Sequence, residues 1–235
     1  MSIWAAVFAR SGSKGLPGKN LKVLGGLPLV AHSIRVGLEI PGVSGVLCST
    51  DSEEIRTVAE KHGATAPFLR PAELAEDDSP EWLSWKHLAR HLIETGASPE
   101  DLLVSLPATA PLRKVADVES AISNHRTYGA DVVVSYTPAV RSPWFNMVTE
   151  GTDGFLRTVI ETDGDAVSRR QDAPKVFDLA TVVYVTTFGF VLSADSLFEG
   201  KVAGIEIPAE RAIDIDSQLD FDIAEYLFDR QKGGS

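Results

Sequence analysis

The stretch IWAAVFA, residues 3–9, runs directly into RSGSKGLPGKN, residues 10–20. The first part is apolar and of strand length, and it lacks the basic leading region of a signal peptide, so it predicts a buried strand. The second part places three glycines and three basic residues, Arg10, Lys14 and Lys19, directly after that strand. Ligands bind at the carboxyl ends of strands in α/β sheets, so this junction predicts where a site would lie.

Apolar runs alternate with amphipathic runs along the rest of the chain. Strands are expected at residues 3–9, 43–49, 102–106, 131–136, 182–185 and 202–207, and helices at residues 28–38, 52–62, 80–95, 116–128, 194–198 and 217–231. Ser52 is expected to cap the second of these helices, and Gly129 to end the fourth. The alternation predicts an α/β fold with a doubly wound, mostly parallel sheet, in a single domain over residues 1–235. Residues 137–174 lack a helical period, so we interpret residues 137–180 as an insertion that leaves the sheet.

Composition narrows the class of partner. Acidic residues outnumber basic ones by 33 to 22, which argues against a nucleic-acid partner because such proteins usually carry a basic face. No apolar run approaches the length that crosses a bilayer, and the single cysteine, Cys48, fits a reducing compartment. We therefore expect a cytoplasmic protein that binds neither nucleic acid nor a membrane.

Residues 10–20 are the strongest candidate for a phosphate site. Glycines let the backbone and its N–H groups approach a ligand closely. Arg10 can hold phosphate oxygens as a fork, and Lys14 and Lys19 supply mobile point charges. The spacing fits neither the Walker loop nor the dinucleotide-binding G-x-G-x-x-G pattern. A solvated basic turn is the alternative, but the position after a strand in an acidic chain favours phosphate binding.

Two carboxylates near the end of the chain are a candidate metal site. Asp214 and Asp216 alternate with isoleucines, so on an extended segment their side chains project from one face. Neighbouring carboxylates repel unless a cation lies between them, and Mg²⁺ prefers such oxygen ligands. Helix capping is the alternative, because Asp216 precedes a predicted helix, but a cap explains only one of the two residues.

Six segments carry a family resemblance when they are taken in order. They are residues 9–20, 49–55, 69–75, 109–113, 169–171 and 213–216. Together they resemble the successive motifs of the CMP-sialic acid synthetases, or acylneuraminate cytidylyltransferases, over nearly the whole chain. The resemblance implies a nucleotide-diphospho-sugar transferase-like fold and a homodimer whose insertion reaches the partner's active site. It also implies attack by the anomeric hydroxyl of a nonulosonic, sialic-acid-like sugar on the α-phosphate of CTP, with release of pyrophosphate.

The resemblance also assigns roles to residues. The nucleotide-binding set it implies is Arg10, Ser11, Gly12, Ser13, Lys14, Gly15, Lys19, Asn20 and Arg70. Arg170, Gln171 and Tyr184 fall near the acceptor sugar, and Asp214 and Asp216 fall on a pair that holds Mg²⁺. Arg10 and Lys14, together with that pair, are the expected catalytic residues.

Two departures from the family pattern fall in the acceptor pocket. Pro107 stands where the family commonly has a glutamine that touches the sugar, and residues 180–184 replace the family's N-G-A-I-Y segment. A third departure, at residues 79–82, falls on the stretch that meets the ribose in the family. A pseudaminic-, legionaminic- or octulosonic-type acid is therefore an alternative acceptor to N-acetylneuraminate. Two rival functions remain: a nucleotidyltransferase that acts on a Kdo-like or other 2-keto-3-deoxy sugar acid, and a non-catalytic nucleotide-sensing protein.

Three other groups of side chains carry less specific sequence signals. Asp51 follows the second strand, where ligands gather, or else caps the next helix. None of the five histidines lies in a motif, so no histidine base is predicted. Trp144 and Phe145 of the insertion favour a dimer core.

Overall fold

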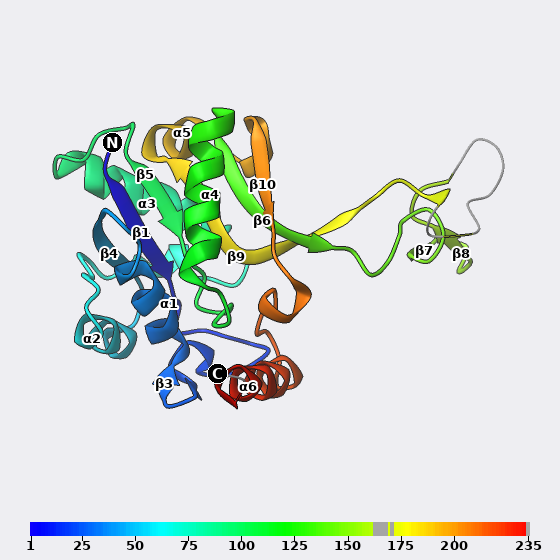
Figure 1. Ribbon diagram of the computed structural model, residues 1–235, viewed down its shortest axis with the longest axis horizontal. Coiled ribbons are helices and arrows are strands. Elements are labelled where there is room, and N and C mark those ends of the chain that lie inside the picture. The colour runs from blue at the N-terminus through cyan, green and yellow to red at the C-terminus, as the bar shows by residue number, and fades with distance from the viewer. Residues whose placement is uncertain (162–168, 170–171, 234–235) are drawn as a thin grey trace.

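The computed structural model describes residues 1–161, 169 and 172–233. A body built around one large sheet carries an arm that projects from it, as Figure 1 shows. Both termini of the described chain lie on the body.

A six-stranded sheet forms the centre of the body, in the order β10-β6-β9-β5-β1-β4. Its strands are β1 (Ile3–Phe8), β4 (Val43–Ser49), β5 (Leu102–Ser105), β6 (Val132–Pro138), β9 (Phe177–Thr187) and β10 (Val202–Glu206). β1 pairs in parallel with β4 and β5, and β10 pairs in parallel with β6. Among the described strands of this sheet β9 alone runs antiparallel, between β5 and β6. The prediction of a mostly parallel α/β sheet is confirmed.

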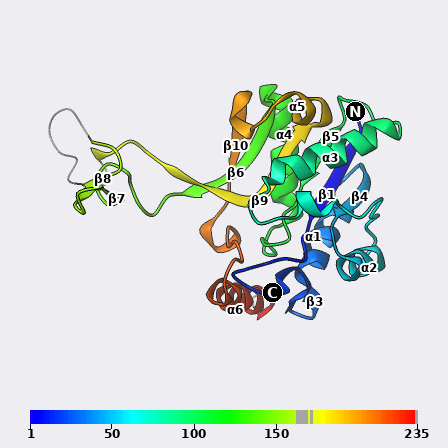
Figure 2. The ribbon, with the colours of Figure 1, turned by 180° about the vertical axis from the view of Figure 1, so that it is seen from behind.

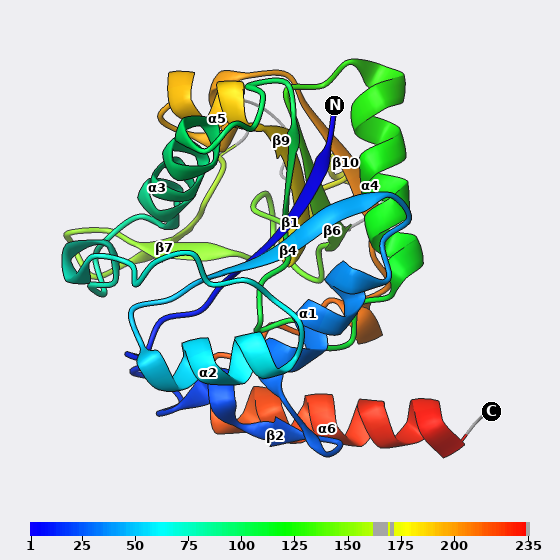
Figure 3. The same cartoon turned by 90° about the vertical axis from the view of Figure 1, so that its left-hand side faces the viewer.

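Helices cover both faces of this sheet. α1 (Leu29–Leu38), α2 (Glu53–Lys61) and α4 (Val115–Tyr128) bury side chains in one core cluster, and α3 (Glu81–Glu94) and α5 (Phe188–Ser193) in another. Neighbouring strand residues divide between the two clusters: Ala5 and Val7 face the first, and Ala6 faces the second. Figure 1 looks onto the α4 side, Figure 2 onto the α3 side, and Figure 3 shows both helical layers edge-on.

Local signals in the sequence explain most helix ends. The Ser52 side chain accepts a hydrogen bond from the Ile55 N–H and caps α2, as predicted. Gly129 ends α4 in the left-handed conformation, with φ of 55°, as predicted. The helix expected at residues 194–198 is wrong, because α5 ends at Ser193 and only the 3₁₀ turn Leu197–Glu199 follows. Thr187 caps α5, and burial of Phe188 and Val191 fixes it against the sheet.

The arm is an extension of two sheet strands. β6 and β9 stay paired out to Pro138 and Phe177, past a register shift between Val134 and Ser135. The Ser135 hydroxyl compensates for the interrupted ladder there by accepting hydrogen bonds from the N–H groups of Val182 and Val183. The hairpin of β7 (Val148–Glu150) and β8 (Leu156–Thr158) lies at the far end of the arm (Figure 1).

The C-terminal helix returns the chain to its beginning. α6 (Gln218–Gly233) packs Phe221 and Ala224 in a third cluster with Leu24 and Leu29, beside the hairpin of β2 (Val23–Leu24) and β3 (Leu27–Pro28). The segment that precedes α6 is thereby held next to the loop that follows β1. Among the described residues, no helix combines the length and apolar character that a membrane span needs.

Candidate nucleotide-binding site

A cavity of about 630 Å³ opens at the carboxyl end of β1. Residues 10–20 form a glycine-rich loop after β1. Six residues of this loop line the cavity, namely Arg10, Ser13, Lys14, Gly15, Lys19 and Asn20. Arg70 and Asp216 line it as well, so three segments that are distant in sequence meet there. Thr109, which follows β5, is also on the wall. The cavity therefore lies where an α/β sheet holds its ligands.

Close contacts give the glycine-rich loop its path. The Asn20 side-chain amide donates a hydrogen bond of 2.8 Å to the Arg10 carbonyl and so ties the two ends of the loop together. A Cβ on Gly15 would stand 2.3 Å from the Asp216 carbonyl oxygen, so only glycine allows the loop to meet the C-terminal segment. Gly18 adopts a φ of 67°, which glycine tolerates without strain. Ser11 and Gly12 do not line the cavity.

Asp51 anchors the start of this loop. Its carboxylate accepts hydrogen bonds from the Ser11 N–H at 2.9 Å and from the Ser11 hydroxyl at 2.6 Å. Because Ser52 caps α2, the alternative role of Asp51 as that cap is wrong. The residue follows β4, next to β1, and neighbouring parallel strands end at the same edge of the sheet. That adjacency is the signal from which its contact with residue 11 could have been inferred.

Arg70 places a buried cation on the cavity wall. Its Nη1 donates to the Ser84 hydroxyl at 3.1 Å, and its Nη2 lies 3.9 Å from the Asp51 carboxylate. The Arg70 N–H donates to the Thr50 carbonyl, which fixes the backbone beside the end of β4. Burial lowers the pKa of Arg70 and the Asp51 charge opposes that shift, but a guanidinium keeps its proton at neutral pH.

Asp216 lines the cavity, whereas Asp214, two residues earlier, is not among the residues that line it. The Asp216 carboxylate lies 2.8 Å from the Lys19 ammonium. Asp214 Oδ1 is buried without a hydrogen-bond partner among the described residues. Capping does not account for Asp216, since Ser217 and Asp220 cap α6 by exchanging hydrogen bonds. An orphaned carboxylate oxygen two residues before an acidic residue of the cavity wall fits a hard cation.

Within residues 1–161, 169 and 172–233, no larger metal-binding cluster accompanies the pair. In the described part of the chain no group of three or more His, Cys, Asp or Glu side chains is arranged to hold a metal ion. Mg²⁺ commonly takes one or two protein carboxylates and completes its shell with water and phosphate oxygens, so two carboxylates suffice.

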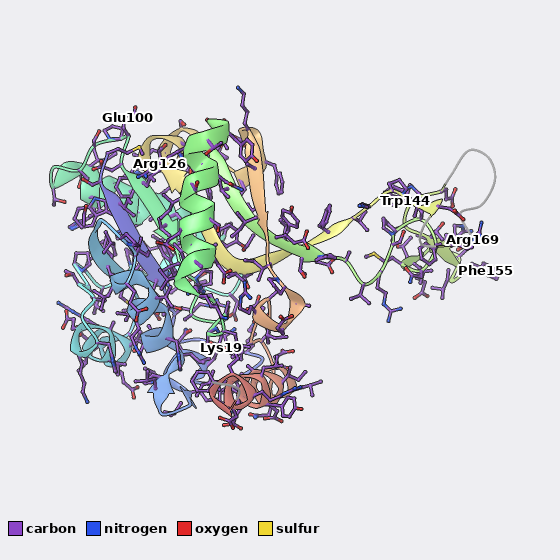
Figure 4. The ribbon with its side chains drawn as sticks, viewed as in Figure 1. Lys19, Glu100, Arg126, Trp144, Phe155 and Arg169 are labelled. Carbon is purple, nitrogen blue, oxygen red and sulfur yellow. The ribbon has the colours of Figure 1, made fainter. Side chains whose placement is uncertain are left out.

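The sugar-side residues divide between the body and the arm. Tyr184 lies on β9 with its ring 5.6 Å from the Trp85 ring, and it packs against the core cluster of α3 and α5 without lining the cavity. Burial, together with the charges of Glu81 and Asp214, raises the pKa of Tyr184 to about 12, so it stays a neutral phenol. Arg170 and Gln171 lie outside the described residues. Their neighbour Arg169 lies at the end of the arm with Trp144, away from Lys19 on the body (Figure 4).

Two acidic residues that line the cavity, Asp77 and Glu81, are not among the site residues that the sequence predicts. Glu81, at the start of α3, accepts a hydrogen bond of 2.9 Å from the Trp85 indole, and desolvation raises its pKa. The Asp77 carboxylate contacts both Arg10, at 3.0 Å, and Lys14, at 2.6 Å. Asp77 precedes α3 and Glu81 begins it. Sequence patterns place this helix correctly, but they do not show which of its neighbouring side chains line the cavity.

Fold and site together define a nucleotide-binding α/β protein. A family model described as Cytidylyltransferase matches residues 5–173, well over half of the chain. The chain therefore belongs to the cytidylyltransferase family, and it is a nucleotidyltransferase.

Relatives and solved structures agree with this family. The chain is 34% identical to post-translational flagellin modification protein B of Campylobacter coli, over 96% of this chain and 94% of that protein. It is 33% identical, with the same shares covered, to a CMP-N,N'-diacetyllegionaminic acid synthase of Campylobacter jejuni. A solved CMP:2-keto-3-deoxy-manno-octonic acid synthetase, complexed with CTP, matches with a TM-score of 0.72 and 17% identity, over 98% of this chain and all of that one. The resemblance of the six sequence segments is thus confirmed at the level of the family, and the solved structure supports the fold.

Proposed function

We propose that this chain transfers CMP from CTP to a nonulosonic, sialic-acid-like sugar acid and releases pyrophosphate. The observation that carries the proposal is the concentration of Arg10, Lys14, Lys19 and Arg70 around one cavity, in a chain whose net charge is −11. Cations gathered against the overall charge of a protein favour a strongly anionic ligand.

The loop residues account for the nucleotide half of the reaction. We assign the triphosphate to Arg10, Ser13, Lys14 and Gly15, and the nucleoside side of CTP to Arg70. The anomeric hydroxyl gives its proton to solvent and its oxygen bonds to the α-phosphorus, while the bond from that phosphorus to the bridging oxygen breaks and pyrophosphate leaves with the electron pair. Arg10 and Lys14 stabilise the charge that builds on the departing pyrophosphate. Catalysis then rests on positioning and charge rather than on a covalent enzyme intermediate.

Asp214 and Asp216 are proposed to hold Mg²⁺. The unpartnered Asp214 oxygen and the cavity-facing Asp216 carboxylate support this role. A bound Mg²⁺ would neutralise phosphate charge and align the α-phosphate. Asp216 itself also holds Lys19 at 2.8 Å, and so keeps that ammonium on the cavity wall.

The acceptor is proposed to be a nonulosonic acid of the legionaminic or sialic type. Support comes from the name of the Campylobacter jejuni relative and from its coverage of nearly the whole chain. We assign Tyr184 to the wall of the acceptor pocket, with Arg170 and Gln171 supplying groups for an anionic sugar.

A homodimer completes the proposed enzyme. The arm leaves the body (Figure 1), and its end, with Phe155, lies away from Lys19 on the body (Figure 4). Large apolar side chains on the arm face solvent, and Phe155 and Leu156 are 69% and 66% exposed. Such a surface favours burial against a second copy. We place this dimer in the cytoplasm, in keeping with a single buried cysteine.

A pyrophosphate-release assay tests the function. The purified chain is incubated with CTP, UTP, GTP or ATP and with N-acetylneuraminate, legionaminic-, pseudaminic- and Kdo-type acids in turn. We expect pyrophosphate release with CTP and a nine-carbon acid. Release only with a Kdo-type acid would contradict the acceptor class. Tight CTP binding without release for every acid would instead indicate a nucleotide-sensing protein.

A further inference from the structure

The segment between the 3₁₀ turn Ala72–Leu74 and α3 presents a carboxylate to the glycine-rich loop. Asp77 Oδ1 lies 3.0 Å from Arg10 Nη1, and Asp77 Oδ2 lies 2.6 Å from the Lys14 ammonium. Arg10 Nη1 also donates to the Glu76 carbonyl at 2.8 Å. One short segment therefore engages both cations that we assign to the triphosphate.

Asp77 and a triphosphate need the same side chains. A carboxylate paired with two cations presents to them the charge and the oxygen acceptors that a phosphate group would bring. Two anions held in the same cavity repel each other. The polyphosphate must therefore compete with this carboxylate for Arg10 and Lys14.

The position of Asp77 allows it to move away. Residues 75–80 form neither helix nor strand, and the Asp77 side chain is 40% exposed. The ends of the segment are fixed, because the Ser84 hydroxyl of α3 donates to the Leu74 carbonyl at 3.2 Å. The contacts of Asp77 with Lys14 and Arg10 lower its pKa, so it carries its charge at neutral pH.

We propose that Asp77 is an internal competitor of the polyphosphate. It pairs with Arg10 and Lys14 in the nucleotide-free protein, leaves them when CTP enters, and returns to them as pyrophosphate leaves. It thereby weakens the binding of both CTP and pyrophosphate and favours product release. This inference rests on the proposed function, which assigns those two cations to the triphosphate.

Asp77→Asn tests the inference, with Asp78→Asn as a matched control that removes the same charge one position along. Binding of CTP and of inorganic pyrophosphate is measured by calorimetry, without acceptor sugar, both in Mg²⁺ and in EDTA. Exposed ion pairs contribute little each, so we expect Asp77→Asn to bind both ligands about three- to tenfold more tightly, and Asp78→Asn to stay within about twofold of wild type. Unfolding curves check that each variant folds.

Two results would overturn the inference. Unchanged binding in Asp77→Asn would show that the carboxylate does not compete. Weaker binding would show that Asp77 orients Lys14 or holds the metal, the latter if the loss occurs only in Mg²⁺.

Lys14→Ala separates this inference from the proposed function. If Lys14→Ala binds pyrophosphate as wild type does, the loop is not the phosphate site, and the proposed nucleotide site fails with the inference. Asp77→Asn could bind pyrophosphate more tightly while the wild type forms no pyrophosphate from CTP with any acceptor acid. In that case the proposed function fails and the role of Asp77 stands.

Discussion

The Lys19 ammonium lies 2.8 Å from the Asp216 carboxylate, although the two residues are 197 positions apart in the chain. Lys19 comes from the loop after the first strand, and Asp216 directly precedes the cap of the last helix. The contact brings the two ends of the chain to one cavity wall. Gly15 reinforces it by leaving room for the Asp216 carbonyl oxygen.

Asp216→Asn is expected to weaken the dependence of the reaction on Mg²⁺. The change removes a charged oxygen from the proposed metal pair while keeping the shape of the side chain. Loss of a ligand should raise the Mg²⁺ concentration for half-maximal pyrophosphate release by about tenfold or more. Asp229→Asn, an exposed change elsewhere on α6, is the control. Full activity of the wild type in EDTA would refute the metal site.

Gly15→Ala is expected to damage both stability and turnover. The new Cβ would overlap the Asp216 carbonyl oxygen, so the loop or the C-terminal segment must shift, at a cost of about 1–3 kcal/mol in the free energy of unfolding. Gly12→Ala is the matched control for stability, because a Cβ there meets nothing within 4 Å. Equal urea midpoints for the two variants would contradict the close approach.

Asp51→Asn is expected to raise the KM for CTP more than it lowers kcat. The amide keeps one acceptor oxygen but loses the charge that faces Arg70 and the second strong bond to Ser11. Ser11→Ala should show a smaller effect in the same direction, since it removes only the hydroxyl bond. Glu53→Gln, on the exposed start of α2, serves as the charge control. A loss confined to the melting temperature, with unchanged KM, would mean that Asp51 supports the fold alone.

The double variant Phe155→Ser with Leu156→Ser is expected to separate the proposed dimer. Light scattering should give twice the chain mass of 25.3 kDa for the wild type and the single chain mass for the variant. Turnover should fall while CTP binding persists, because the cavity of each chain is intact. Tyr128→Ser, an equally exposed aromatic on the body, should leave the dimer unchanged. A monomeric wild type would disprove the assembly.

Sequence patterns predict several strands of the sheet closely. β4 matches its expected range, and β1 and β5 fall within one residue of theirs. β1 and β5 are marked by short apolar runs that are mostly buried. β9 is different: it begins at Phe177 on the exposed arm, where no buried alternation marks it, so only residues 182–185 are expected as strand. α5 is missed because its six residues are too few to show a helical period.

The sequence predicts the part of the site that lies in one continuous stretch. Glycines and cations clustered after a strand are visible in a single stretch of sequence, and all but Ser11 and Gly12 of the assigned loop residues line the cavity. Asp51, Asp77 and Glu81 are not visible in this way, because their roles depend on which distant loop they face. Their contacts are set by strand order and by the path of residues 75–80, and neither follows from local spacing.

The most direct test of the proposed function compares pyrophosphate release by wild type and Lys14→Ala with CTP and a nonulosonic acid. Lys61→Ala, an exposed lysine on α2, is the control. Removing a cation that stabilises the departing pyrophosphate should lower kcat by about a hundredfold or more, with the melting temperature unchanged and Lys61→Ala fully active. Wild-type turnover in Lys14→Ala would contradict the assignment of the glycine-rich loop to the triphosphate.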